Sequence, residues 1–198
     1  MTALTDHCDT IRSWLNFDYD DALIISWTRM AETTLSETLR SKHQVQIDVG
    51  VIEQSRVLLP SDWIELITIR FMDGAPIRYV PHDYFFREAV KGEYTLSGNY
   101  LLVGGSPSVE DGQQIELTYY QQIPPLGDEM NWLMRYYPAV YIAATLTASA
   151  SFSLEDERAA AWEERTKQLV DSINGSSAAA KNSGSLMVLR KPKIKGFG

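Results

Sequence analysis

The residue types most often used for catalysis or metal binding are scarce and scattered in this sequence. The three histidines, His7, His43 and His82, fall in different predicted elements, and none has a partner at a metal-ligand spacing such as i, i+4. The single cysteine, Cys8, lies on the apolar side of a predicted helix, where no nearby base could activate it as a nucleophile. We interpret these residues as surface, turn or core side chains, and we predict no catalytic residue, no metal site and no cofactor.

Two further segments have compositions that occur at ligand sites. Asp18, Asp20 and Asp21 could hold a hard cation, but the residue alternation and the glycine of an EF-hand loop are missing. The glycine-rich segment 104–112 joins two predicted strands and lacks the Gly-Lys-Ser/Thr ending of a phosphate-binding loop. We therefore interpret the aspartates as helix-start residues and the glycine-rich segment as a connecting loop.

Charge is distributed unevenly along the chain. The formal net charge is −8, but the segment 172–198 contains five Lys or Arg and no acid, so residues 1–171 carry −13. Affinity for phosphate backbones comes from Lys and Arg, so the acidic body argues against tight nucleic-acid binding. An acidic wall repels DNA and is compatible with a duplex that passes nearby.

The composition also bears on compartment and size. One cysteine cannot form an internal disulfide, which favours a reducing environment. The sequence has no N-terminal apolar segment of the signal-peptide kind and no apolar run long enough for a membrane span, so we expect neither export nor membrane insertion. With 44% apolar residues, the chain can build the core of one domain, with or without a sub-domain.

Helical periodicity marks both ends of the chain. Residues 5–16 and 19–41 each place apolar residues on one face, and Thr5 is in position to cap the first helix. A second helical region follows residues 124–125 and must kink or restart at Pro138. It continues after a predicted capping box at 153–156 toward an expected stop at 174–175, although the alanines at 178–180 could add a few turns.

Between the helical regions the period changes to that of strands. Val45, Ile47, Val49 and Val51 alternate with polar residues and predict a half-buried strand with these four side chains facing inward. The next strands are expected as two hairpins, 67–71 with 77–80 and 94–97 with 100–103, with a short helix at 82–90 between them. A last strand at 114–119 is expected to turn Ile115, Leu117 and Tyr119 inward.

Strands joined by hairpins instead of helical crossovers predict an α+β fold. The terminal helices are expected to pack as a helical bundle with an inserted antiparallel β-hairpin sub-domain and an extended C-terminal tail. The expected divisions are 1–43 and 124–174 for the bundle helices, 44–123 for the β sub-domain, and 175–198 for a flexible docking tail.

Short motifs follow one another in a defined order from the middle strands to the C-terminus. They are Leu59-Pro60-Ser61-Asp62-Trp63, the hairpin from Tyr94 to Val103, the paired Tyr119-Tyr120 before Pro124, the interruption at Pro138, a final helix with Trp162, and Ser183-Gly184-Ser185-Leu186 before the basic end. This order, over residues 45–190, resembles the adaptor or head-completion proteins that join head to tail in tailed bacteriophages.

The resemblance implies a non-enzymatic structural virion protein. It implies a ring beneath the portal, commonly of twelve copies, that connects capsid to tail and leaves a channel for DNA. The implied partners are the phage portal protein, tail, nozzle or tail-terminator proteins, and neighbouring copies in the ring. DNA would pass through the channel without sequence-specific binding, and no membrane would take part. The protein would be found in the virion neck, after assembly in the host cytoplasm.

The C-terminal tail is the predicted portal-docking site. Residues 175–184 would act as a tether, residues 186–189 as an apolar anchor that adds as a strand or fills a groove, and the basic end as an electrostatic latch. The predicted docking residues are Ser183, Gly184, Leu186, Met187, Val188, Leu189, Arg190, Lys191, Lys193 and Lys195.

Two other classes of function stay open at this point. The basic tail could instead make the chain a nucleic-acid-binding protein, for which five cations predict a salt-dependence slope of about −4 to −5 on duplex DNA. A small enzyme with a scattered acidic site would need two carboxylates in one cleft with raised pKa values.

Overall fold

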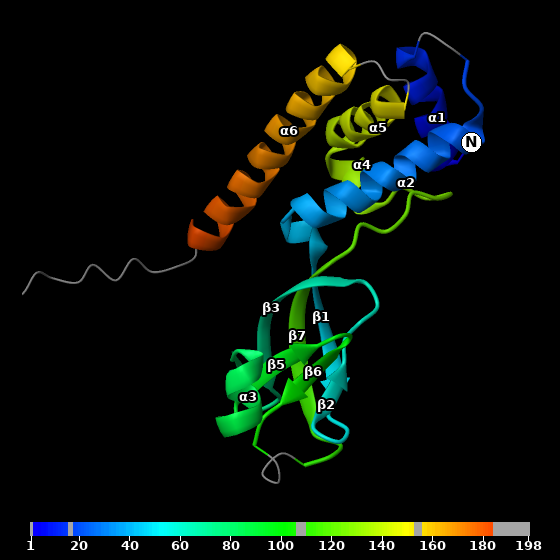
Figure 1. Cartoon of the computed structure of the whole chain (residues 1–198). Helices are drawn as coiled ribbons and strands as arrows, with labels where there is room; N and C mark the ends of the chain where they lie inside the picture. The colour runs from blue at the N-terminus through cyan, green and yellow to red at the C-terminus, as the bar shows by residue number, and fades with distance from the viewer. Residues whose placement is uncertain (1, 16–17, 106–109, 153–155, 184–198) are drawn as a thin grey trace, which may run out of the picture.

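The computed structural model describes residues 2–15, 18–105, 110–152 and 156–183, which form a helical lobe and a β lobe (Figure 1). With 49% helix, 24% strand and antiparallel sheets, the structure confirms the predicted α+β class. The helical lobe contains α1 (Ala3–Trp14), α2 (Asp21–Thr38), α4 (Trp132–Tyr136), α5 (Pro138–Phe152) and α6 (Asp156–Ser183). A 3-10 turn, η1 (Lys42–Gln44), leads from α2 into the β lobe.

Side-chain caps fix where the N-terminal helices begin. The hydroxyl of Thr2 accepts the backbone N–H of Thr5 at 3.2 Å, so the cap lies three residues before the expected one and Thr5 lies inside the helix. Asp20 caps α2 by accepting the N–H of Leu23 at 2.8 Å. The predicted cap at Thr5 was therefore wrong by about one turn, because a second threonine at Thr2 was also available.

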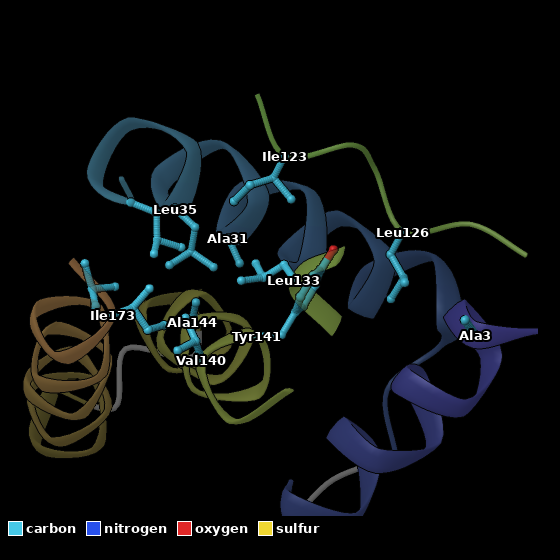
Figure 2. Close-up of a cluster of buried hydrophobic side chains, with 12 residues drawn as sticks. Ala3, Ala31, Leu35, Ile123, Leu126, Leu133, Val140, Tyr141, Ala144 and Ile173 are labelled. Atoms are coloured by element: carbon cyan, nitrogen blue, oxygen red, sulfur yellow. The ribbon is translucent and has the colours of Figure 1, made fainter. Parts of the chain in front are cut away.

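Helix α5 is the centre of the helical lobe. It packs against α6, α2 and α1, and it is buried on several sides, as expected for a helix with almost no polar face. Figure 2 shows one of its two clusters, in which side chains from α2, α5 and α6 meet the segment that carries Ile123 and Leu126. Pro138 begins α5 directly after α4, which confirms the predicted interruption.

Two sheets make up the β lobe. One has the order β1-β7-β3 and the other β2-β6-β5-β4, and every pair is antiparallel except the two-residue pair β4–β5. Their bounds are β1 (Val45–Val51), β2 (Arg56–Leu58), β3 (Trp63–Phe71), β4 (Arg78–Tyr79), β5 (Glu93–Ser97), β6 (Tyr100–Val103) and β7 (Gln114–Gln121). Ile115, Leu117 and Tyr119 face the core between the sheets, as predicted, and the hairpin β5–β6 is also confirmed.

Strand β1 exists, but its predicted orientation was wrong. Ile47, Val49 and Val51 are 65%, 47% and 42% exposed, so the apolar row faces outward. The register explains the difference, because Val49 lies opposite Glu116 and Gly50 lies opposite Ile115, and directly opposed residues share a face. Gly50 therefore takes the inward position, where a Cβ would lie only 2.3 Å from the side chain of Val57.

Three other local expectations need correction. The turn after Phe71 forms, and the N–H of Ile77 donates to the carbonyl of Ile69 at 2.9 Å, but Arg78–Tyr79 then pairs in parallel with β5 and the predicted hairpin is completed only in part. The short helix expected at 82–90 forms as α3 (His82–Glu88), two residues shorter, and none of its residues is buried. Helix α6 does not stop at Gly175 but continues to Ser183, because one glycine costs only about 1 kcal/mol and alanines follow it.

Candidate assembly surfaces

Residues 175–183 of the predicted docking tail 175–198 form the end of the longest helix, where a flexible tether over 175–184 was expected. Helix α6 has 28 residues, which corresponds to about 42 Å, and it lies along one side of the helical lobe (Figure 1). Ser183 is its last residue. The other predicted docking residues, Gly184, Leu186, Met187, Val188, Leu189, Arg190, Lys191, Lys193 and Lys195, lie outside the described residues. Docking by the tail therefore stays a prediction.

Asn174 joins α6 to the end of α2. Its Oδ1 accepts the backbone N–H of Arg40 at 2.7 Å, and its Nδ2 donates to the carbonyl of Thr38 at 3.0 Å. Val170 and Ile173, just before it, are buried in the helical core. These contacts satisfy one backbone group in the last turn of α2 and one just beyond it, and they fix the direction of α6.

A buried carboxylate holds the segment that leaves the β lobe. Glu32 of α2 is 5% exposed, and its Oε1 accepts the N–H of Leu126 at 2.6 Å and the hydroxyl of Tyr141. Arg29 donates to both carboxylate oxygens at 2.8 and 2.9 Å, and also to the carbonyl of Leu126 at 2.8 Å. In Figure 2 the Tyr141 hydroxyl points from α5 toward α2 and this segment.

Further hydrogen bonds attach the same segment on both sides of Glu32. Ser36 accepts the N–H of Ile123 at 3.0 Å, and Gln44 donates to the carbonyl of Gln121 at 3.4 Å. Asn131 donates to the carbonyl of Pro124 at 2.6 Å. The connection from β7 to α4 is therefore bonded to the helical lobe along its length, which fixes the direction of the β lobe.

Sequence reasoning missed this cluster, although one signal was present. Glu32 lies among the buried positions Thr28, Ala31, Leu35 and Ser36 of α2, where a carboxylate is unexpected. A charged residue on a buried helix face needs partners, and that requirement could have marked it. Its partners Leu126 and Tyr141 lie 94 and 109 residues away in the sequence, and no local pattern identifies them.

Burial shifts the pKa values of three side chains in the two lobes. Burial first, and then the hydrogen bond to Glu32, raise the pKa of Tyr141 well above its ordinary value, so its hydroxyl stays protonated and donates. Burial lowers the pKa of His7 to about 4, and its Nε2 lies 3.2 Å from the hydroxyl of Thr145. Burial and the neighbouring Asp62 raise the pKa of Tyr119 to about 12. These groups keep one protonation state near neutral pH, which suits a structural role.

The other residues considered for chemistry have structural positions. Cys8 is a buried free thiol, and burial raises its pKa. His43 stacks on Tyr136 with ring centroids 4.3 Å apart, and burial lowers its pKa. Asp20 caps α2 and Asp21 lies in its first turn, as predicted, whereas Asp18 lies before the cap. Asp18 and Asp21 both pair with Arg12. Across the described ranges, no group of three or more His, Cys, Asp or Glu could hold a metal ion.

Two apolar surfaces lie on the β lobe, away from the helical core. The first, which we call the β1 row, consists of Ile47, Val49 and Val51. The second, which we call the aromatic hollow, is a depression of about 370 Å³ between α3 and the outer face of β6. It is lined by Gln54, Ser55, Arg56, Phe85, Phe86, Ser97, Tyr100, Leu102 and Val103.

A third apolar surface lies in the helical lobe. A groove of about 650 Å³ runs between α2 and α6, with small residues of α5 such as Ala144 and Ala148 at its base. Met30, on its α2 side, is 56% exposed. No helix in the part of the chain that the structure describes is long and apolar enough to cross a membrane.

Comparison with known proteins identifies the family of the chain. A search of curated proteins finds no match to the chain. The profile of one protein family, described as SU10 adaptor protein, matches residues 2–188, which is nearly the whole sequence. The match spans both lobes and ends within the predicted anchor segment 186–189. The chain therefore belongs to the SU10 adaptor protein family, a family of phage head-to-tail adaptors.

Proposed function

We propose that this protein is a structural component of the virion neck, which joins the portal of the capsid to the tail. The match to an adaptor family over residues 2–188 carries the proposal. In it, neighbouring copies form a ring, commonly of twelve, around the channel through which DNA passes. The protein performs no catalysis, and its partners are the portal protein, tail or nozzle proteins and other copies of itself.

The acidic body fits a channel through which DNA must slide. Residues 1–171 carry a formal charge of −13, and a wall of that sign repels phosphates and leaves the duplex mobile. Five cations in the segment 172–198 give the opposite sign to the part proposed to dock. The charge pattern therefore separates an acidic body, which repels DNA, from a basic C-terminal segment, which would bind an acidic protein partner.

The proposed docking step uses the tail that follows α6. Asn174 and the buried Ile173 fix the direction of α6, so each copy presents its tail from the same place. Leu186 to Leu189 is the anchor, and Arg190 to Lys195 is the latch that meets portal acids. Each exposed ion pair adds only about 0–1 kcal/mol. The ring leaves the portal only when all of its tails are released at the same time, so several tails make the attachment long-lived.

Binding of truncated chains to purified portal tests this mechanism. The full chain should co-sediment with portal rings, and a chain ending at Asn182 should lose binding, because anchor and latch are both removed. A matched variant with Arg190, Lys191, Lys193 and Lys195 changed to Gln keeps the anchor, and should bind with a weaker dependence on salt. Full occupancy of portals by the chain ending at Asn182 would show that the tail does not dock.

The nucleic-acid alternative predicts a different result from the same proteins. If the basic tail binds DNA, the full chain should retain a duplex at low salt and the four-Gln variant should not. We expect no retention by either protein, because the acidic body opposes it.

A further inference from the structure

The two apolar surfaces of the β lobe lie on opposite sides of one sandwich. The β1 row belongs to the sheet β1-β7-β3, and the aromatic hollow lies over the sheet β2-β6-β5-β4. The buried cluster between the sheets includes Leu117 of the first sheet and Leu101 of the second, so their outer faces point apart. A single copy therefore cannot bring its own row to its own hollow.

The β1 row is exposed and lies on an edge strand of its sheet. In the described sheet β1 pairs only with β7, so its other edge is free for a neighbour. Ile47 is the most exposed member at 65%. One carboxylate lies beside the row: Glu116 is directly opposite Val49 on the same face. Arg70 lies opposite Glu116 on the far strand β3.

The aromatic hollow has the complementary form. Phe86 is 63% exposed and Tyr100 is 44% exposed at its margin, and the ring of His82 lies 4.6 Å from that of Phe86. Arg56 is the one charged residue among those that line it, and its side chain has no hydrogen bond or ion pair with the described part of the chain. Aromatic residues with an arginine are the composition enriched at protein interfaces.

We propose that the β1 row of one copy docks in the aromatic hollow of the next copy, as a head-to-tail contact between β lobes. This inference rests on the proposed ring, because a ring needs two different surfaces that fit each other, and the β lobe carries such a pair on opposite sides. Glu116, on the same face as the row, is also opposite in charge to Arg56 of the hollow. The alternative, row against row, would bring Glu116 of two copies to the same interface and would close as a dimer.

Engineered cysteines can distinguish these arrangements in the full chain. Cys8 is buried at 1% exposure, so Ile47→Cys and Phe86→Cys introduce the accessible thiols among the described residues. With a short bis-maleimide, the double variant at high protein concentration should give a ladder of dimers, trimers and larger products. An equimolar mixture of the two single variants should stop at dimers, because each has only one reactive surface. Thr33→Cys with Phe86→Cys, which places one thiol on exposed α2, is the matched control and should give no ladder.

Several results would overturn the contact. These are the absence of a ladder, an equal ladder from the Thr33 control, or dimers from Ile47→Cys alone, which would indicate row-on-row pairing. Adding Val49→Lys to the double variant should abolish the ladder, because it puts a charge in the middle of the row at an exposed site that the fold tolerates. Portal binding by the same variants before cross-linking separates the two proposals: binding without a ladder refutes only the lateral contact.

Discussion

Replacing Glu32 by alanine should cost this protein a large part of its stability. The carboxylate is buried, and it accepts hydrogen bonds from the N–H of Leu126, the hydroxyl of Tyr141 and the guanidinium of Arg29. The substitution leaves the first two donors buried without an acceptor, at about 1–3 kcal/mol each. Arg29 contributes less, because its side chain is 39% exposed and water can replace the ion pair.

The expected loss in unfolding free energy is therefore about 3–5 kcal/mol, in line with other buried ion pairs that lose one partner. Tyr141→Phe removes one donor and leaves the carboxylate its other partners, so it should cost about 1–2 kcal/mol. The double variant should cost less than the sum of the two, because both changes remove the same hydrogen bond. Glu37→Ala, on the exposed side of the same helix, should stay within about 0.5 kcal/mol of the wild type.

Urea titration followed by tryptophan fluorescence measures these differences, because Trp27 is buried at 1% exposure and reports on the helical core. Limited proteolysis gives a second readout, since Glu32 holds the connection between the lobes. Cleavage within 121–131 should appear in Glu32→Ala at urea concentrations that leave the wild type intact. A loss no larger than that of Glu37→Ala would refute the role assigned to this carboxylate.

The remaining predictions concern a buried histidine, an inward glycine and a helix clamp. Burial lowers the pKa of His7 to about 4, so the folded protein favours the neutral ring. The unfolding free energy should therefore be at its full value above about pH 6.5 and should decrease by about 3 kcal/mol as the pH falls from 6.5 to 4. His7→Gln should remove that part of the pH dependence in urea titrations, and an unchanged dependence would contradict the assignment. Gly50→Ala should lower the unfolding free energy by about 1–3 kcal/mol, seen as a lower Tm, because the new Cβ would lie 2.3 Å from Val57. Asn174→Ala leaves the N–H of Arg40 without its acceptor, at about 1–2 kcal/mol, and should speed hydrogen exchange at that amide; unchanged exchange would argue against the clamp.

Local sequence patterns predicted most of the elements. Alternation in 114–119 placed Ile115, Leu117 and Tyr119 on the core face, and the missing donor of Pro138 marked the start of α5. These features depend on residues adjacent in the chain, so they can be read without knowledge of the fold. The family resemblance also came from the order of short motifs, and the profile match over 2–188 supports it.

The orientation of β1 shows where such patterns fail. Alternating Ile47, Val49 and Val51 predicted an inward face, and the strand has the opposite orientation. Periodicity says that one face is apolar but not which way it points, since pairing with Glu116 and the space left by Gly50 decide that. The exposed row then suggests a surface that a second copy can cover.

The sequence by itself therefore determined the α+β class, the main helices and strands, the acidic body with its basic tail, and the adaptor family. Tertiary structure alone decided that Glu32 joins Leu126 and Tyr141, that Asn174 joins α6 to α2, and that the β1 row and the aromatic hollow lie on opposite sides of one lobe. The physical reason is that these relations connect residues far apart in the chain, through pairing register and burial that no local window of sequence contains.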